Sequence, residues 1–137
     1  MDKIYIDTDV ILDFLLDRQP YSEFASNLFL MKEQEQIKLY TSGLVLSNCY
    51  YLLRRLAPHR SVMQKLKSLS SMLEILPITQ RVIHDAMDSR FNDFEDAIQN
   101  ATAAHGGMKI LLTRNTRDYR TSDLSIMTPE EYLRVMI

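Results

Sequence analysis

The sequence predicts an α/β fold with a parallel sheet that helices cover on both faces. Short apolar runs typical of strands recur along the chain, and segments with apolar residues at helical spacing separate them. Strands that alternate with helices pair in parallel, because each connection returns across a face of the sheet. The length of 137 residues fits one domain with its own core, so we expect a single domain over residues 1–137.

The first part of the chain predicts one strand followed by two helices. Residues 3–7 form a short apolar strand, and a helix follows over residues 9–17. Pro20 keeps that helix from continuing, because proline lacks the N–H that a helix interior needs. Ser22 is a good helix cap, and apolar residues at helical spacing follow it, which predicts a second helix.

The middle of the chain predicts two more strands, at residues 37–41 and 73–77. Between them lie a strongly apolar helix at 44–56 and an amphipathic helix at 61–70. Pro58 separates these two helices, since it prevents a simple continuation of the first one.

The last part of the chain predicts a helix at residues 93–104 whose two ends are well marked. Asp93 begins it, where the helix dipole favours an acid, and Gly106 and Gly107 end it in a left-handed turn. The other elements expected here are a helix at 79–87, a strand at 109–113, a short strand at 125–127 and a helix that begins with Thr128.

The composition excludes several classes of protein. The single cysteine, Cys49, cannot form an internal disulfide, and no Cys/His spacing typical of zinc is present. No apolar run approaches the roughly 20 residues that a bilayer requires, and no export signal is apparent, so we expect a cytoplasmic protein without membrane association. The formal net charge of −2 gives no general support for nucleic-acid binding, which must therefore rest on local patches.

Acidic side chains lie beside the predicted ends of strands and helices. Asp7 follows the first strand, Asp96 lies near the start of a helix, and Asp118 lies in the loop after the fourth strand. If the first and fourth strands are neighbours, these groups face one crevice at the carboxyl end of the sheet. Carboxylates crowded together repel one another and usually require a cation, and Mg²⁺ prefers oxygen ligands.

Each acid taken alone has a simpler interpretation. Asp7 or Asp9 would cap a helix, Asp93 and Asp96 would complement a helix dipole, and Asp118 would be an ordinary loop residue. The metal-site interpretation depends on their convergence. A bound Mg²⁺ makes water a better nucleophile and stabilises charge on a phosphoryl oxygen, so the predicted substrate is a phosphodiester.

At these residues the chain resembles the PIN-domain nucleases, especially the toxin ribonucleases of bacterial toxin–antitoxin pairs. The resemblance lies in three segments, Ile6–Asp13 (IDTDVILD), Asp93–Gln99 (DFEDAIQ) and Leu112–Tyr119 (LTRNTRDY). It implies a three-layer α/β/α sandwich with a mostly parallel central sheet of four or five strands. It also implies RNA hydrolysis that depends on Mg²⁺ or Mn²⁺, a homodimer, and an antitoxin as protein partner.

The resemblance also implies roles for individual residues of these segments. Asp7 and Asp96 would be direct metal ligands. Asn115 and Asp118 would supply the remaining polar face and help to place the metal or water. Asp93 would be a further acid at the rim of the metal site.

Two positions differ from the pattern of the family. Asp9 stands where the family often has Asn, so we expect it to cap the helix and, with Thr113, to support the ligands. Asn48 stands where the family usually has a glutamate. An amide has no charge, but its carbonyl oxygen coordinates a metal or accepts from bound water, so we expect a catalytic role for Asn48 and weaker metal binding.

Arginines near the last segment are candidates for binding RNA. Arg114, Arg117 and Arg120 flank the expected crevice, although each also fits an ordinary solvated arginine. Tyr119 is an aromatic residue of the kind that stacks on bases, but we expect it to pack in the protein.

Two alternative functions remain open. The segment from Asp7 to Val10 also resembles the first motif of haloacid-dehalogenase-type phosphatases, in which the first Asp is a nucleophile. That family expects a lysine and an apolar strand before its last acids, whereas Asp93 and Asp96 begin a predicted helix. The other alternative is a PIN-fold domain that has lost efficient catalysis through Asn48 and mainly binds RNA or a protein.

Overall fold

The computed structural model describes residues 1–136 and contains one sheet of five strands, all of them parallel. The strands are β1 (Asp2–Ile6), β2 (Ile37–Ser42), β3 (Glu74–Leu76), β4 (Ile110–Leu112) and β5 (Ser125–Met127). Each strand predicted from the sequence is present, and the predicted α/β class is confirmed.

The helices also follow the predicted order. They are α1 (Thr8–Leu15), α2 (Ser22–Glu33), α3 (Gly43–Leu53), α4 (His59–Ser70), α5 (Gln80–Met87), α6 (Phe94–His105) and α7 (Pro129–Met136). A short 3-10 helix, η1 (Thr116–Tyr119), was not predicted. Helix α3 is shorter than expected, because the chain turns after Leu53 and Arg54 Nη1 donates to Ala57 O at 3.1 Å. Within residues 1–136, no helix is both long and apolar enough to cross a bilayer.

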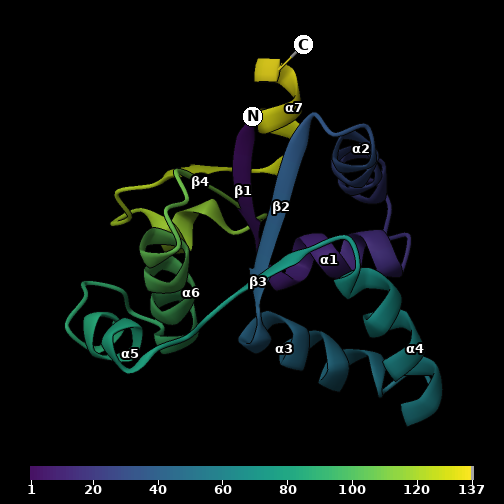
Figure 1. Ribbon diagram of the computed structural model, residues 1–137, viewed down its shortest axis with the longest axis horizontal. Coiled ribbons are helices and arrows are strands. Elements are labelled where there is room, and N and C mark those ends of the chain that lie inside the picture. Colours follow the sequence, from purple (N-terminus) through teal and green to yellow (C-terminus); the bar gives the residue numbers. More distant parts are fainter. Residues whose placement is uncertain (137) are drawn as a thin grey trace.

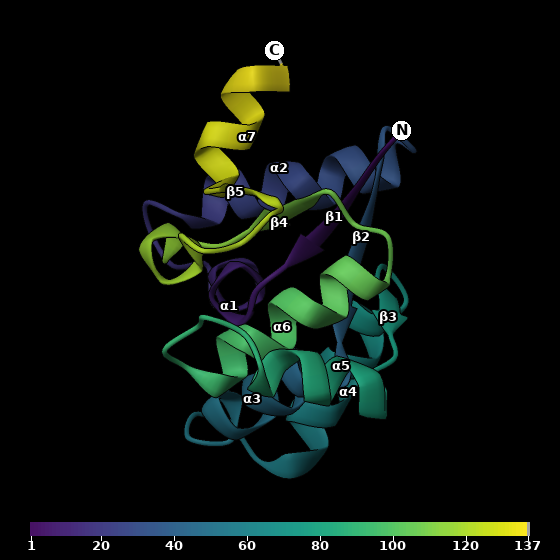
Figure 2. The same ribbon diagram turned by 90° about the vertical axis from the view of Figure 1, so that its left-hand side faces the viewer.

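The helices and the sheet form three layers (Figure 1). Helices α5 and α6 lie on one side of the sheet, and α1, α2 and α4 lie on the other. Figure 2 looks onto the first of these sides, where α6 lies between α5 and the strands. This arrangement is the α/β/α sandwich that the family resemblance implied.

The direction in which strands are added to the sheet changes between β1 and β4. From β1 the chain moves outward to β2 and β3, and then returns to place β4 and β5 on the other side of β1. Ile6 pairs with Leu112, and Asp7 N donates to Leu112 O at 3.1 Å. The predicted proximity of the first and fourth strands is therefore confirmed, and ligands of such sheets bind at this switch point.

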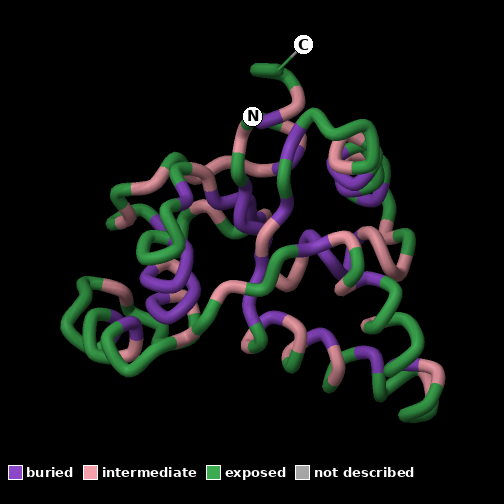
Figure 3. The backbone as a smooth tube through the Cα atoms, in the orientation of Figure 1, coloured by how far each residue is buried: buried purple, intermediate pink, exposed green. Residues whose placement is uncertain are grey.

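The hydrophobic core lies along the central strands and the inner faces of the helices (Figure 3). Ile4, Tyr5 and Ile6 of β1 are completely buried, as are Leu111 and Leu112 of β4. A central parallel strand is covered on both faces, so its sequence is a continuous apolar run rather than an alternation. The core therefore holds the ends of β1 and β4 rigidly against each other.

Capping fixes the two helix ends that lie nearest this switch point. Asp7 Oδ1 accepts from Thr8 N at 2.6 Å at the start of α1, and Asp93 Oδ1 accepts from Asp96 N at 3.0 Å at the start of α6. The expectation that Asp9 caps the helix is wrong, because Asp9 lies inside the first turn and Asp7 is the cap. Gly107, with φ of 79°, makes the left-handed turn predicted after α6.

Candidate active site

Asp7 lies at the carboxyl end of β1 with both carboxylate oxygens engaged. Oδ1 accepts from Thr8 N, and Oδ2 accepts from Thr113 Oγ1 at 2.9 Å and from the Tyr119 hydroxyl at 3.5 Å. Only 7% of Asp7 is exposed. The start of α1, the residue after β4 and the end of η1 thus all contact one carboxylate, and together they hold it in a single orientation.

The buried hydroxyl of Tyr119 connects Asp7 to Asp96. It donates to Asp96 Oδ1 at 3.3 Å, and the ring packs edge-on against Phe91 with centroids 5.6 Å apart. Burial and the negative charges of Asp7 and Asp96 raise the pKa of Tyr119 far above its ordinary value, so the hydroxyl keeps its proton. The predicted packing of Tyr119 is confirmed, but no pattern in the sequence indicated this polar link.

Asp96 carries the strongest sign of excess negative charge. Burial, followed by the charges of Asp93, Asp7 and Asp118, raises the pKa of Asp96 to about 7. A hydroxyl has one hydrogen, so Tyr119 donates to only one of its two acids at a time. This one hydroxyl therefore does not offset the charges of both acids, and a cation at the site would reduce their mutual repulsion.

Asp9 connects α1 to the loop that follows β4. Its Oδ2 accepts from Arg114 N at 3.1 Å and from Asn115 Nδ2 at 3.4 Å, while its Oδ1 is buried without a hydrogen-bond partner. Burial and then the charge of Asp7 raise the pKa of Asp9 to about 6. Asp9 therefore positions Asn115 at the site and adds to its negative charge.

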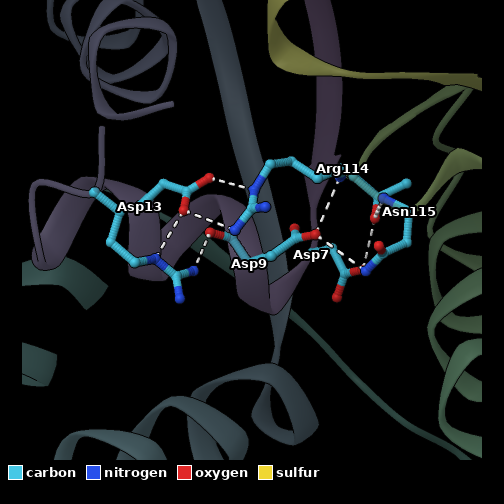
Figure 4. A network of polar contacts seen from close by, with 7 residues as sticks. Asp7, Asp9, Asp13, Arg114 and Asn115 are labelled. Atoms are coloured by element: carbon cyan, nitrogen blue, oxygen red, sulfur yellow. Dashed lines mark hydrogen bonds and ion pairs between the residues drawn. The ribbon is translucent and has the colours of Figure 1, made fainter. Parts of the chain in front are cut away.

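Asp13, one turn further along α1, binds two arginines (Figure 4). Arg114 makes a forked contact with it, Nε to Oδ2 at 2.8 Å and Nη2 to Oδ1 at 3.0 Å, and Arg18 Nε donates to Oδ1 at 2.9 Å. The Arg114 guanidinium also lies 4.0 Å from the ring centroid of Tyr21. Arg114 therefore anchors the loop that follows β4 to helix α1. The only sign of this role in the sequence is the spacing of Asp9 and Asp13, which places them on one face of the helix.

Two adjoining cavities are lined by the predicted site residues other than Thr113, and Asp96 lines both. The larger, of about 540 Å³, is lined among others by Asp7, Asp9, Asn48, Glu95, Asp96, Gln99 and Asn115. The other, of about 420 Å³, is lined among others by Asp93, Asp96, Arg117, Asp118 and Arg120. The structure thus brings Asn48 and Asn115 to Asp7, and it places Asp93 and Asp118 in the neighbouring cavity.

Glu95 is a residue of this site that the sequence analysis did not single out. Asn48 Nδ2, on α3, donates to Glu95 Oε1, on α6, at 2.5 Å. The contact crosses the larger cavity, which both residues line. Its only signal in the sequence is a second acid beside Asp96 in the Asp93–Gln99 segment.

The chemistry of these side chains fits a hard divalent cation. Among residues 1–136, no three His, Cys, Asp or Glu side chains form a ready-made metal cluster. Mg²⁺ usually takes only one or two carboxylates and keeps several waters, so it does not need such a cluster. The larger cavity offers carboxylate and amide oxygens, and Asp9 Oδ1 and Gln99 Oε1 there are buried acceptors without a donor.

Comparisons with known proteins agree with this geometry. Ribonuclease VapC1 of Aquifex aeolicus is 24% identical over 136 residues, covering 96% of this chain and 93% of that protein. A toxin–antitoxin complex from Klebsiella pneumoniae contains a chain with a TM-score of 0.70 and 21% identity, covering 92% of this chain and 97% of that one. VapC20 of Mycobacterium tuberculosis, described as a sarcin-ricin loop cleaving toxin, has a TM-score of 0.62 and 22% identity, over 79% of this chain and 86% of its own.

The family model of the PIN domain matches residues 3–117, from the first strand through the loop that carries Arg114 and Asn115. This match includes all three segments on which the resemblance was based, apart from the last two residues of the third. The chain therefore belongs to the PIN-domain family.

Proposed function

We propose that this chain is a ribonuclease that hydrolyses RNA phosphodiester bonds with Mg²⁺ or Mn²⁺, as the toxin of a toxin–antitoxin pair. The observation that carries the proposal is the meeting of Asp7 and Asp96 at one cavity, where the Tyr119 hydroxyl lies between them. Membership of the PIN-domain family supports nuclease chemistry. The names of the relatives, a ribonuclease and a toxin that cleaves the sarcin-ricin loop, support RNA as the substrate.

Asp7 and Asp96 would hold the cation, and Asn115 and Asp118 would complete the polar face. When bound, the cation lowers the pKa of a water nucleophile and offsets charge on the phosphoryl oxygen. Thr113 and the start of α1 keep Asp7 oriented through its two oxygens, and Asp9 holds the amide of Asn115. Arg117 and Arg120 line the adjoining cavity, from which they would hold RNA phosphates.

We infer an antitoxin as partner, because the structural relatives include chains from toxin–antitoxin complexes. A homodimer is proposed as well. Large apolar side chains are exposed along α3 and α4, in the turn between them and at the sheet edge, namely Tyr51, Leu52, Leu56, Met63 and Ile75. Such a surface is typical of proteins that associate.

The direct test is cleavage of labelled RNA by the purified chain, with and without Mn²⁺. We expect cleavage only with the metal, and a loss of about 100-fold or more in D7N and D96N. D123N is the matched control, because Asp123 is an exposed acid that lines neither cavity. Cleavage without metal, or full activity in D7N, would refute the proposal.

The same preparation separates the two alternatives. Turnover of a phosphomonoester without RNA cleavage would favour the phosphatase, although Asp93 and Asp96 begin a helix here rather than follow a strand. RNA binding without cleavage at any Mn²⁺ concentration would favour a binding domain that has lost catalysis.

A further inference from the structure

We propose that Glu95 supplies the carboxylate that a PIN-domain site lacks when Asn stands at position 48. Glu95 would bind the divalent cation, or its water, from α6, and the Asn48 amide would hold Glu95 in place from α3. This inference rests on the proposed metal-dependent activity. It makes Glu95 a metal ligand, although Glu95 was not among the acids that the sequence predicted for the site.

The contact between Asn48 and Glu95 is the first observation. A carboxylate only accepts hydrogen bonds, so the amide nitrogen of Asn48 is the atom that must face it. The bond is charge-assisted, which makes it short and strong. Two glutamates at this separation would repel each other, so the pair places one negative charge at this point, as a single glutamate at position 48 would.

The balance of charge in the larger cavity is the second observation. Four carboxylates line it, those of Asp7, Asp9, Glu95 and Asp96. The two arginines that also line it, Arg18 and Arg114, direct their guanidinium groups to Asp13 instead. Within residues 1–136, none of these four carboxylates forms an ion pair with a basic side chain. The cavity therefore has a negative charge that a cation would neutralise.

The buried amide of Gln99 is the third observation, and it is independent of the other two. Gln99 lies one helical turn after Glu95 on α6, lines the same cavity and is only 3% exposed. Its Oε1 atom is buried without a donor. A buried acceptor normally has a partner, and this one lacks it within the described chain. A water carried by a bound cation would supply the missing donor.

The first part of the test measures metal binding directly, without RNA. Mn²⁺ binding is followed by isothermal titration calorimetry and by electron paramagnetic resonance of the free ion. We expect E95Q to weaken Mn²⁺ binding at least tenfold, roughly the loss seen when outer partners of metal ligands are removed. E23Q is the matched control, because Glu23 is also an exposed glutamate in the first turn of a helix and lies outside both cavities. The Mn²⁺ affinity of E23Q should equal that of the wild type.

The second part exchanges the two groups. In N48E/E95Q the carboxylate moves to α3 and the amide to α6, so the same pair is present in reverse. We expect the double variant to regain most of the Mn²⁺ affinity and RNA cleavage that E95Q loses. Circular dichroism of each variant should show that the fold is retained, because Glu95 is exposed and Asn48 is only partly buried.

The outcomes separate this inference from the proposed function. Wild-type affinity in E95Q, together with abolished binding in D96N, would refute the role of Glu95 and leave the nuclease proposal standing. Weak binding in E95Q with no recovery in N48E/E95Q would also refute it. The double variant has the net charge of the wild type, so a carboxylate at position 48 would then not be equivalent to the one that Glu95 supplies. A wild-type chain that neither binds Mn²⁺ nor cleaves RNA would refute the proposed function itself.

Discussion

Tyr119 donates its buried hydroxyl to Asp96 at 3.3 Å, and the same oxygen lies 3.5 Å from Asp7. A side chain from the loop after β4 thereby sets the distance between acids contributed by β1 and α6. The hydrogen bond lowers the pKa of Asp96, in opposition to the burial and the charges that raise it. Tyr119 is thus a positioning residue that also adjusts how readily Asp96 gives up its proton.

The substitution Y119F tests this role. We expect the fold to persist, because Phe retains the buried ring and its packing against Phe91. Loss of the hydroxyl should raise the pKa of Asp96, so the pH midpoint of Mn²⁺ binding should move upward. The control is Y132F, since Tyr132 is also buried and donates to a carboxylate, Asp2, at 2.7 Å, but lies outside the site. Equal midpoints in Y119F and Y132F would contradict the prediction.

The stability of the metal-free chain should depend on pH through Asp96. Its pKa of about 7 lies above the value of about 3.9 for an unfolded Asp, so the folded chain keeps the proton longer. The resulting contribution to stability is complete below about pH 4 and is lost as the pH rises to about 7. Urea denaturation in EDTA across this pH range measures the free energy of unfolding. In D96N, the decrease in this free energy between about pH 4 and pH 7 should be smaller than in the wild type, because residue 96 no longer titrates. Parallel curves for wild type and D96N would show that Asp96 does not titrate in this way.

Asp13 should matter for stability more than any surface acid. Its side chain is 2% exposed and binds Arg18 and Arg114, so D13N should reduce the free energy of unfolding by about 1.5–3 kcal/mol. E130Q removes an exposed pair with Arg134 one turn away and should cost less than about 0.5 kcal/mol. Chemical denaturation of both variants gives the comparison. A loss in D13N no larger than that in E130Q would argue against a structural role for the cluster.

Arg117 and Arg120 should bind RNA phosphates without selecting a sequence. In a D96N background, which prevents cleavage, R117A/R120A should weaken RNA binding and flatten its salt dependence. The slope of log affinity against log salt should fall by about 0.7 for each phosphate that the protein no longer neutralises. R81A serves as control, because Arg81 is exposed on α5 and lines neither cavity. An unchanged slope in the double variant would show that these arginines do not bind RNA.

Local features of this protein follow from its sequence. The order of strands and helices is readable from the apolar runs, and the caps at Asp7 and Asp93 and the turn at Gly107 depend only on nearby residues. The 3-10 helix η1 escaped prediction, because four residues are too few for a periodic pattern. Asp9 was misjudged as a cap because the neighbouring Asp7 competes for the same position.

The partners of the site residues were decided only by the tertiary structure. The sequence by itself indicated the acids, the strand ends and the family they resemble. It did not show that Arg114 binds Asp13, that Tyr119 joins Asp7 to Asp96, or that Asn48 holds Glu95. Such contacts join residues far apart in the chain, and they depend on strand order and on how each helix is rotated against the sheet. Periodicity states which face of a helix is buried, but it does not state which side chain of another element that face will meet.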